Sequence, residues 1–81
     1  MDKVSVYRKL KKKYRLHDRQ VCYMGDDEFD LPLLRIAGFS AAPSDALEAV
    51  TSEVDYVAVN EGGRGAVREV IDMILLAQGA R

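Results

Sequence analysis

Several residue types that often carry stability or chemistry are scarce in this sequence. It has one cysteine, one histidine and no tryptophan. A single cysteine excludes an internal disulfide, and it favours a reducing compartment, so we expect the cytoplasm. Cys22 lies in an apolar run, where we expect a buried, unreactive thiol. His17 lies in a charged linker, and we expect it to be solvated and not a base or metal ligand.

Long hydrophobic segments are also missing. No apolar run approaches the roughly 18 residues that a membrane span needs, and the first residues lack the apolar core of a signal peptide. We therefore expect a soluble chain with no membrane partner. With 81 residues, we expect a single domain over residues 1–81. A domain of this size buries only about 60% of the surface that its unfolded chain exposes.

Charge is unevenly distributed along the chain. The formal net charge is −1, but residues 1–20 carry eight Lys/Arg and two Asp, which leaves −7 on the remaining residues. A basic segment can form a nucleic-acid-binding face. Here, however, the cations surround a helical pattern with only tyrosines interleaved, which favours a solvated helix face. We predict no nucleic-acid partner.

Helical and extended patterns alternate along the sequence. We expect helices over residues 3–15, from 32 to 38, from 43 onward and from 66 to 78, and strands over residues 20–24, 39–42 and 55–59. In the third helix, Asp45 and Glu48 have the spacing of a capping box. Strands that alternate with helices predict an α/β protein, with a three-layer, Rossmann-like arrangement in which a partial parallel sheet of about three strands is flanked by helices.

Three aspartates follow the first predicted strand. Asp26, Asp27 and Asp30 come after an apolar run and Gly25. Open α/β sheets bind ligands beyond the carboxyl ends of their strands, and clustered carboxylates are stabilised by a cation, so Mg²⁺ with a phosphorylated ligand is one interpretation. Gly-Asp-Asp is also favourable turn chemistry, so a solvated acidic turn is the alternative. Asp30 is in addition a candidate cap for the helix at Pro32.

A glycine-rich segment, residues 60–65, precedes the last predicted helix. Three glycines surround Arg64, and backbone N–H groups with a guanidinium can bind a phosphate or carboxylate. A flexible connection explains the composition equally well. Arg68 stands four residues before Asp72, the spacing of a helical ion pair.

Four segments together resemble one known family. They are Val21-Cys22-Tyr23-Met24-Gly25-Asp26-Asp27-Glu28-Phe29-Asp30-Leu31-Pro32, Ala37-Gly38-Phe39-Ser40, Asp55-Tyr56-Val57 and Gly62-Gly63-Arg64-Gly65-Ala66-Val67-Arg68-Glu69-Val70. The chain is similar, over essentially all its length, to the C-terminal half of the 3-deoxy-D-manno-octulosonate 8-phosphate phosphatase family. That family is a capless branch of the haloacid dehalogenase superfamily. The Gly-Asp-Asp-x-x-Asp motif is widespread in the superfamily, and its combination with the glycine-rich segment is much more specific.

The resemblance implies a Mg²⁺-dependent reaction on a sugar-acid phosphate. By position, it implies that Asp26 is a Mg²⁺ ligand and that Asp27 and Asp30 support the metal shell and the active-site loop. It further implies that Lys3 neutralises the attacking carboxylate and the transferring phosphoryl group. These are the catalytic and metal-binding residues that the sequence predicts.

The resemblance also implies a substrate-binding region and an assembly. Arg64, and Arg68 in the helix that follows, lie in the region expected to meet an anionic group of the substrate. Enzymes of the family are commonly tetramers in which a neighbouring subunit closes the active site. We therefore expect a homo-oligomer.

One departure from the family pattern bears on activity. Superfamily members attack phosphate with an aspartate of an N-terminal Asp-x-Asp strand, and the 81 residues contain no Asp-x-Asp. Because covalent phosphoryl transfer needs that carboxylate beside the metal, we expect a truncated C-terminal portion that is inactive alone. The alternative is a non-catalytic oligomerisation or assembly module that uses an unpaired edge of the sheet.

Overall fold

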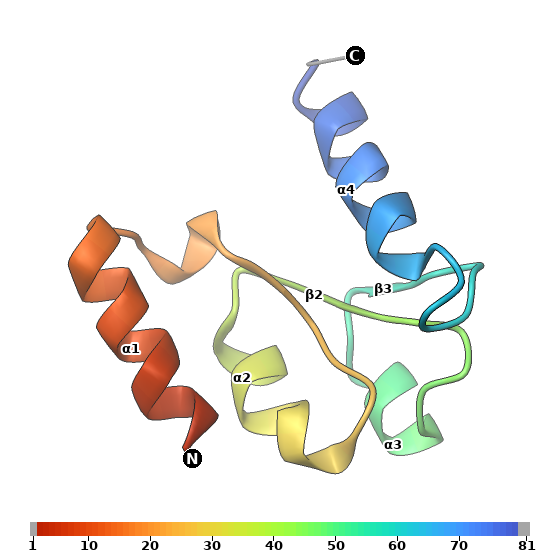
Figure 1. Ribbon diagram of the computed structural model, residues 1–81, viewed down its shortest axis with the longest axis horizontal. Coiled ribbons are helices and arrows are strands. Elements are labelled where there is room, and N and C mark those ends of the chain that lie inside the picture. The colour runs from red at the N-terminus through yellow and green to blue at the C-terminus, as the bar shows by residue number, and fades with distance from the viewer. Residues whose placement is uncertain (1, 80–81) are drawn as a thin grey trace.

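The predicted α/β architecture is present in the computed structural model, which describes residues 2–79. The main elements are α1 (Lys3–Tyr14), β1 (Cys22–Met24), α2 (Leu31–Ile36), β2 (Phe39–Ala42), α3 (Glu48–Thr51), β3 (Tyr56–Val57) and α4 (Ala66–Ala77), with short 3₁₀ helices η1 (Asp18–Gln20) and η2 (Glu28–Asp30). Within the described residues the strands form one parallel sheet in the order β1-β2-β3 (Figure 1). The predicted fold class is confirmed.

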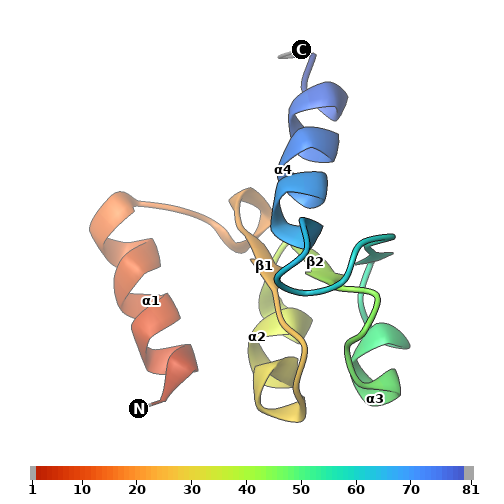
Figure 2. The ribbon, with the colours of Figure 1, turned by 45° about the vertical axis from the view of Figure 1, so that its right-hand side comes forward.

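The protein has three layers, in which the sheet lies between helices, and the two faces of the central strand β2 show this. Successive side chains of a strand point to opposite faces. Accordingly, Ala41 packs with Val70 of α4, whereas Ala42 packs with Leu34 of α2 and Val50 of α3. Figure 2 shows α4 on one side of the sheet and α2 and α3 on the other. The small alanine side chains let the helices approach the sheet closely.

Strand β1 is an edge strand. In the part of the chain that the structure describes, it pairs only with β2. A cavity of about 580 Å³ lies between Cys22 and α4, and another of about 480 Å³ lies between Tyr23, α1 and α2. Cys22 is exposed on this edge, so the prediction of a buried thiol was wrong. An apolar run does not reveal whether its strand is central or at an edge.

Helix α1 is only partly packed against the rest of the protein. Asp2 caps it by accepting a hydrogen bond from the backbone N–H of Val4 at 3.0 Å. Of three large side chains spaced three or four residues apart along the helix, Tyr7 is buried, whereas Leu10 and Tyr14 are exposed. Figure 2 shows α1 standing to one side of the other helices. Its basic residues lie mainly on the solvent side, as predicted for a solvated helix face.

Helix α4 is apolar around most of its circumference. Val70 is buried against the sheet, while Val67, Ile71 and Leu76 are 59%, 50% and 62% exposed. The helix has 12 residues. Within residues 2–79, no helix combines the length and the apolar character that a membrane crossing requires.

The segment after β2 differs from its prediction. A turn occupies residues 44–46, and α3 begins only at Glu48. Asp45 does not cap this helix. Its carboxylate instead accepts a hydrogen bond from the backbone N–H of Gly62 at 2.8 Å. The predicted capping box was therefore wrong, and Asp45 ties this turn to the glycine-rich segment.

Gly38 allows the start of β2 to pass close to η1. Its N–H donates to the carbonyl of Asp18 at 2.7 Å, and a Cβ at this position would collide with the backbone of Asp18 and Arg19. We expect Gly38→Ala to destabilise the fold by about 1–3 kcal/mol, because neither backbone segment can move freely. A Cβ at Gly62 would meet its neighbours at 3.5 Å, so Gly62→Ala is the matched control. Urea unfolding midpoints test this, and equal losses for both variants would contradict it.

Candidate active site

The acidic loop is positioned by the carboxyl end of β1. The strand ends at Met24, and the N–H of Gly25 still donates to the carbonyl of Ala41 in β2 at 3.2 Å. The chain then turns into η2, where the Asp27 carboxylate accepts from the N–H of Phe29 at 3.3 Å and caps this short helix. The loop therefore lies at the edge of the sheet where parallel α/β folds place ligands.

Asp30 connects three parts of the chain. It is only 5% exposed. Its Oδ1 accepts hydrogen bonds from Lys3 Nζ at 2.7 Å and from the Tyr23 hydroxyl at 2.8 Å. Its Oδ2 accepts from the backbone N–H groups of Asp26 and Asp27 at 3.1 and 3.3 Å. Asp30 stands at the N-cap position of α2, as predicted, but its side chain makes no capping hydrogen bond to that helix.

The charges of this cluster follow from its hydrogen bonds. Burial by itself raises the pKa of Asp30, but the hydrogen bonds from Lys3 and Tyr23 outweigh it and hold the pKa below its usual value. The hydrogen bond to Asp30 raises the pKa of Lys3. Burial, followed by the same carboxylate, raises the pKa of Tyr23. At neutral pH the cluster therefore contains an ionised carboxylate, a charged ammonium and a protonated phenol.

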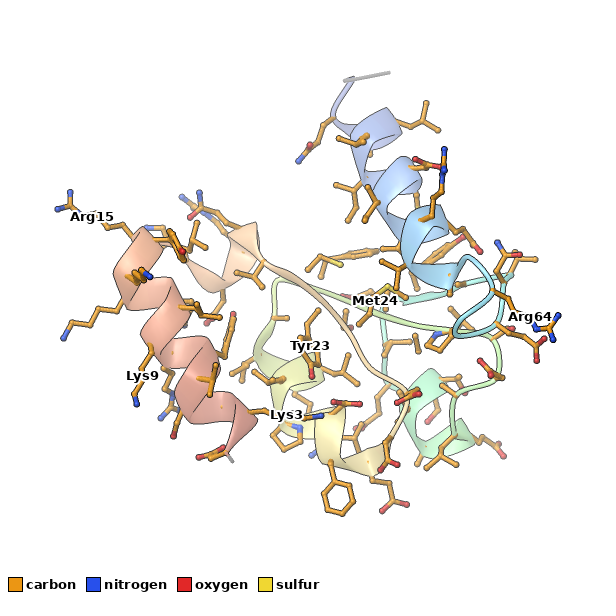
Figure 3. The ribbon with its side chains drawn as sticks, in the orientation of Figure 1. Lys3, Lys9, Arg15, Tyr23, Met24 and Arg64 are labelled. Carbon is orange, nitrogen blue, oxygen red and sulfur yellow. The ribbon has the colours of Figure 1, made fainter. Side chains whose placement is uncertain are left out.

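These side chains line a cavity of about 330 Å³ together with Asp26. Among the described residues, no hydrogen bond ends on the Asp26 carboxylate, whose backbone N–H is held by Asp30. Figure 3 shows the Lys3 side chain extending from the start of α1 toward the body of the protein, whereas Lys9 and Arg15 extend away from it. The structure thus brings the predicted residues Lys3, Asp26 and Asp30 together.

Arg64 and Arg68 are not part of this cavity. Their side chains are 81% and 82% exposed. Arg64 Nε lies 4.0 Å from a carboxylate oxygen of Glu61, and Arg68 Nε lies 3.6 Å from Asp72 Oδ2, which confirms the predicted helical pair. Figure 3 shows Arg64 at the far side of the protein from Lys3, pointing outward. A substrate-binding role for either arginine stays a prediction.

The donor set fits one part of a magnesium site. Mg²⁺ prefers six oxygen ligands and commonly takes one or two carboxylates together with waters and substrate phosphate. Asp26 offers free carboxylate oxygens, but both oxygens of Asp30 already accept two hydrogen bonds each. Within residues 2–79 there is no group of three or more His, Cys, Asp or Glu that could hold a metal ion. The described residues can therefore contribute a ligand to a Mg²⁺ ion through Asp26, but they do not form a complete metal site.

Sequence reasoning missed Glu69, which organises the neighbouring loop. Its carboxylate accepts from the Tyr56 hydroxyl at 2.6 Å, from the N–H groups of Val59 and Asn60 at 2.9 Å, and from Asn60 Nδ2 at 2.9 Å. The bond from Tyr56, followed by those from the backbone, lowers the pKa of Glu69 to about 2. No local pattern announces this role, because the partners precede Glu69 by 9 to 13 residues.

Comparison with known proteins assigns the family. The sequence profile of the haloacid dehalogenase-like hydrolases matches residues 1–71. The chain belongs to this family. It is 44% identical over 77 residues to the curated 3-deoxy-D-manno-octulosonate 8-phosphate phosphatase of Yersinia pestis, an alignment that covers 95% of this chain and 41% of the relative. The chain thus spans about two fifths of the length of the curated relatives that it matches.

Solved structures of such phosphatases share the fold. The Yersinia pestis enzyme superposes with a TM-score of 0.94 at 44% identity, over 96% of this chain and 42% of that chain. The Moraxella catarrhalis enzyme, solved in complex with a magnesium ion, a phosphate ion and a KDO molecule, superposes with a TM-score of 0.89 at 38% identity, over 94% of this chain and 44% of that chain. The family resemblance inferred from the sequence is confirmed.

The two cavity aspartates should respond differently to neutralisation. We expect Asp30→Asn to destabilise the protein by about 2–4 kcal/mol, because four donors lose the buried, ionised carboxylate that they share. Asp26→Asn is the matched control in the same loop and should change stability by less than about 0.5 kcal/mol, because the side chain is exposed. Denaturant unfolding of both variants measures the difference. A larger loss in Asp26→Asn than in Asp30→Asn would contradict the assigned roles.

Glu69 should make stability depend on pH. Its pKa is lowered in the folded chain to about 2 from an ordinary value of 4.5, so its contribution is complete above pH 4.5 and is lost as the pH falls toward 2. We expect the melting temperature of Glu69→Gln to lie below that of the wild type at neutral pH, with a gap that narrows over this range. Glu61→Gln, an exposed residue nearby, should show no such gap. A gap that stays constant with pH would disprove the assignment.

Proposed function

We propose that this chain supplies the magnesium-binding and lysine-bearing part of a phosphatase that hydrolyses a sugar-acid phosphate of the 3-deoxy-D-manno-octulosonate 8-phosphate type. One observation carries the proposal: a cavity beyond the end of β1 is lined both by Asp26, whose carboxylate is free, and by Lys3, whose ammonium is held by Asp30. An anion-binding cation next to an open metal ligand suits a phosphoryl group. The names of the relatives supply the substrate class.

Each residue of the cluster has a proposed role. Asp26 ligates Mg²⁺, which when bound neutralises phosphoryl charge and orients the substrate. Lys3 directs its ammonium at the same phosphoryl oxygens and at the attacking carboxylate. Asp30 holds Lys3 and the loop in place, and Asp27 contributes its backbone N–H and the cap of η2. For Arg64 and Arg68, which are exposed outside this cavity, we propose contact with an anionic group of the substrate beyond the phosphoryl site.

The attacking carboxylate is proposed to come from another polypeptide segment. The 81 residues contain no Asp-x-Asp, so we propose that the chain alone is inactive. The open edge of β1, with apolar cavities on both of its faces, supports the pairing of such a segment with this strand. Reducing conditions suit the single cysteine, so we place the reaction in the cytoplasm.

A non-catalytic assembly module is the second candidate. It is favoured by the unpaired β1 edge and by the exposed Val67, Ile71 and Leu76 of α4, since exposed apolar surfaces and strand edges promote association. Sedimentation of the 81-residue chain, together with thermal melting in the presence and absence of Mg²⁺, tests this candidate. A stable homo-oligomer whose melting temperature does not respond to Mg²⁺ would favour this role over the phosphatase.

A chimaeric enzyme tests the phosphatase proposal. The matching portion of the Yersinia pestis phosphatase is replaced by this chain, and phosphate release from 3-deoxy-D-manno-octulosonate 8-phosphate is measured with Mg²⁺. We expect activity in the chimaera and none in the 81-residue chain alone. Asp26→Asn should lower kcat/KM by at least about 100-fold through loss of a metal ligand.

The matched control for this experiment is Glu28→Gln, an exposed carboxylate two residues further along the loop, which should leave kcat/KM unchanged. A chimaera that folds with a cooperative melting transition yet releases no phosphate would overturn the proposal. Turnover by the 81-residue chain alone, abolished by Asp26→Asn, would overturn the claim that a second segment is required.

A further inference from the structure

Tyr23 and Lys3 share one oxygen of Asp30. The phenol donates to Oδ1 at 2.8 Å and the ammonium donates to the same atom at 2.7 Å. Oδ2 is occupied by two backbone N–H groups of the acidic loop. Every acceptor direction of the carboxylate is therefore assigned to a donor.

This arrangement restricts where the Lys3 ammonium can lie. A carboxylate oxygen has two in-plane acceptor directions. The Tyr23 hydroxyl takes one direction on Oδ1, so only the other remains for Lys3. Lysine has a long and flexible side chain, and that of Lys3 is 55% exposed, so packing alone does not fix its position.

We propose that Tyr23 is a positioning residue for Lys3, because its hydroxyl leaves the ammonium a single acceptor direction, at the cavity that Asp26 also lines. The inference rests on the proposed function for its catalytic meaning, since Lys3 is the group proposed to meet the phosphoryl oxygens. Its structural content, the restriction of Lys3 by Tyr23, stands on the geometry of Asp30 alone.

Tyr23→Phe isolates the hydroxyl from the ring. The Tyr23 ring packs against the cluster formed by Leu34, Ala42 and Val50, and phenylalanine keeps that contact. Without the hydroxyl, Oδ1 offers two directions to Lys3, and the ammonium is no longer restricted to one of them. A role limited to packing would leave Lys3 unaffected by this substitution.

The chain contains a matched control with the same chemistry. Tyr7 and Lys11 both donate to Asp18 Oδ1, each at 2.6 Å. None of the three lines the cavity of Asp26. Tyr7→Phe therefore removes a hydroxyl from a more exposed triad of the same residue types, away from the candidate active site.

The first test measures the order of the Lys3 ammonium in the 81-residue chain. Nitrogen-15 relaxation of the side-chain ammonium groups, at mildly acidic pH where their protons exchange slowly, should find Lys3 more ordered than the exposed Lys9 of the same helix. We expect Tyr23→Phe to lower the order of Lys3, because its ammonium can then take either direction on Asp30 Oδ1, and Tyr7→Phe to leave it unchanged. Unaltered order of Lys3 in a folded Tyr23→Phe chain would overturn the proposal.

The second test uses the chimaeric phosphatase. Tyr23→Phe should lower kcat about tenfold with little change in KM, an effect of the size found for residues that orient catalytic groups. In a Lys3→Met background, Tyr23→Phe should have no further effect on kcat, because the hydroxyl acts through the lysine. An equal loss in both backgrounds would refute the positioning role.

The two tests separate the two proposals. Loss of Lys3 order in Tyr23→Phe, together with chimaeras that release no phosphate, would support the positioning of Lys3 and reject the proposed function. Activity in the chimaera, together with unaltered Lys3 order, would support the function and reject the positioning role.

Discussion

The buried carboxylate of Asp30 is the interaction on which the candidate active site depends. A charge that is 5% exposed is costly unless it is paired and fully hydrogen-bonded, and here four donors from α1, β1 and the acidic loop satisfy it. Gly25 makes this possible, because a Cβ at that position would collide with the Asp30 side chain. The loop, the strand and the first helix are thus fixed relative to one another by a single group.

The same contact links the site to the least packed part of the fold. Helix α1 leaves Leu10 and Tyr14 exposed, so burial of apolar surface contributes little to holding it. The ion pair at its first turn and the burial of the Tyr7 ring compensate for this. Placing the site lysine at the anchored end of the helix keeps the ammonium in position even where the rest of the helix packs loosely.

The sequence predicted those features that local patterns determine. Hydrophobic periodicity and turn residues located the helices and strands, and the acidic motif after β1 indicated the candidate site. Predictions were wrong or missing where contacts between residues far apart in the sequence determine the structure. Asp45 binds a backbone N–H 17 residues away, Glu69 binds groups across a loop, and the exposure of Cys22 depends on which strand occupies the edge of the sheet. Such pairings are properties of the folded chain and leave no spacing signal.

Two carboxylates four residues apart acquire different roles from their surroundings. Asp30 is saturated with donors, so its charge is neutralised within the chain and it serves to hold other groups. The Asp26 carboxylate accepts no hydrogen bond among residues 2–79, although its own backbone N–H is fixed by Asp30. Its acceptor positions therefore stay open on the cavity that Lys3 also lines, a condition that suits a divalent cation. Hydrogen bonding, not residue type, thus distinguishes the aspartate that holds the loop from the aspartate proposed to meet the ligand.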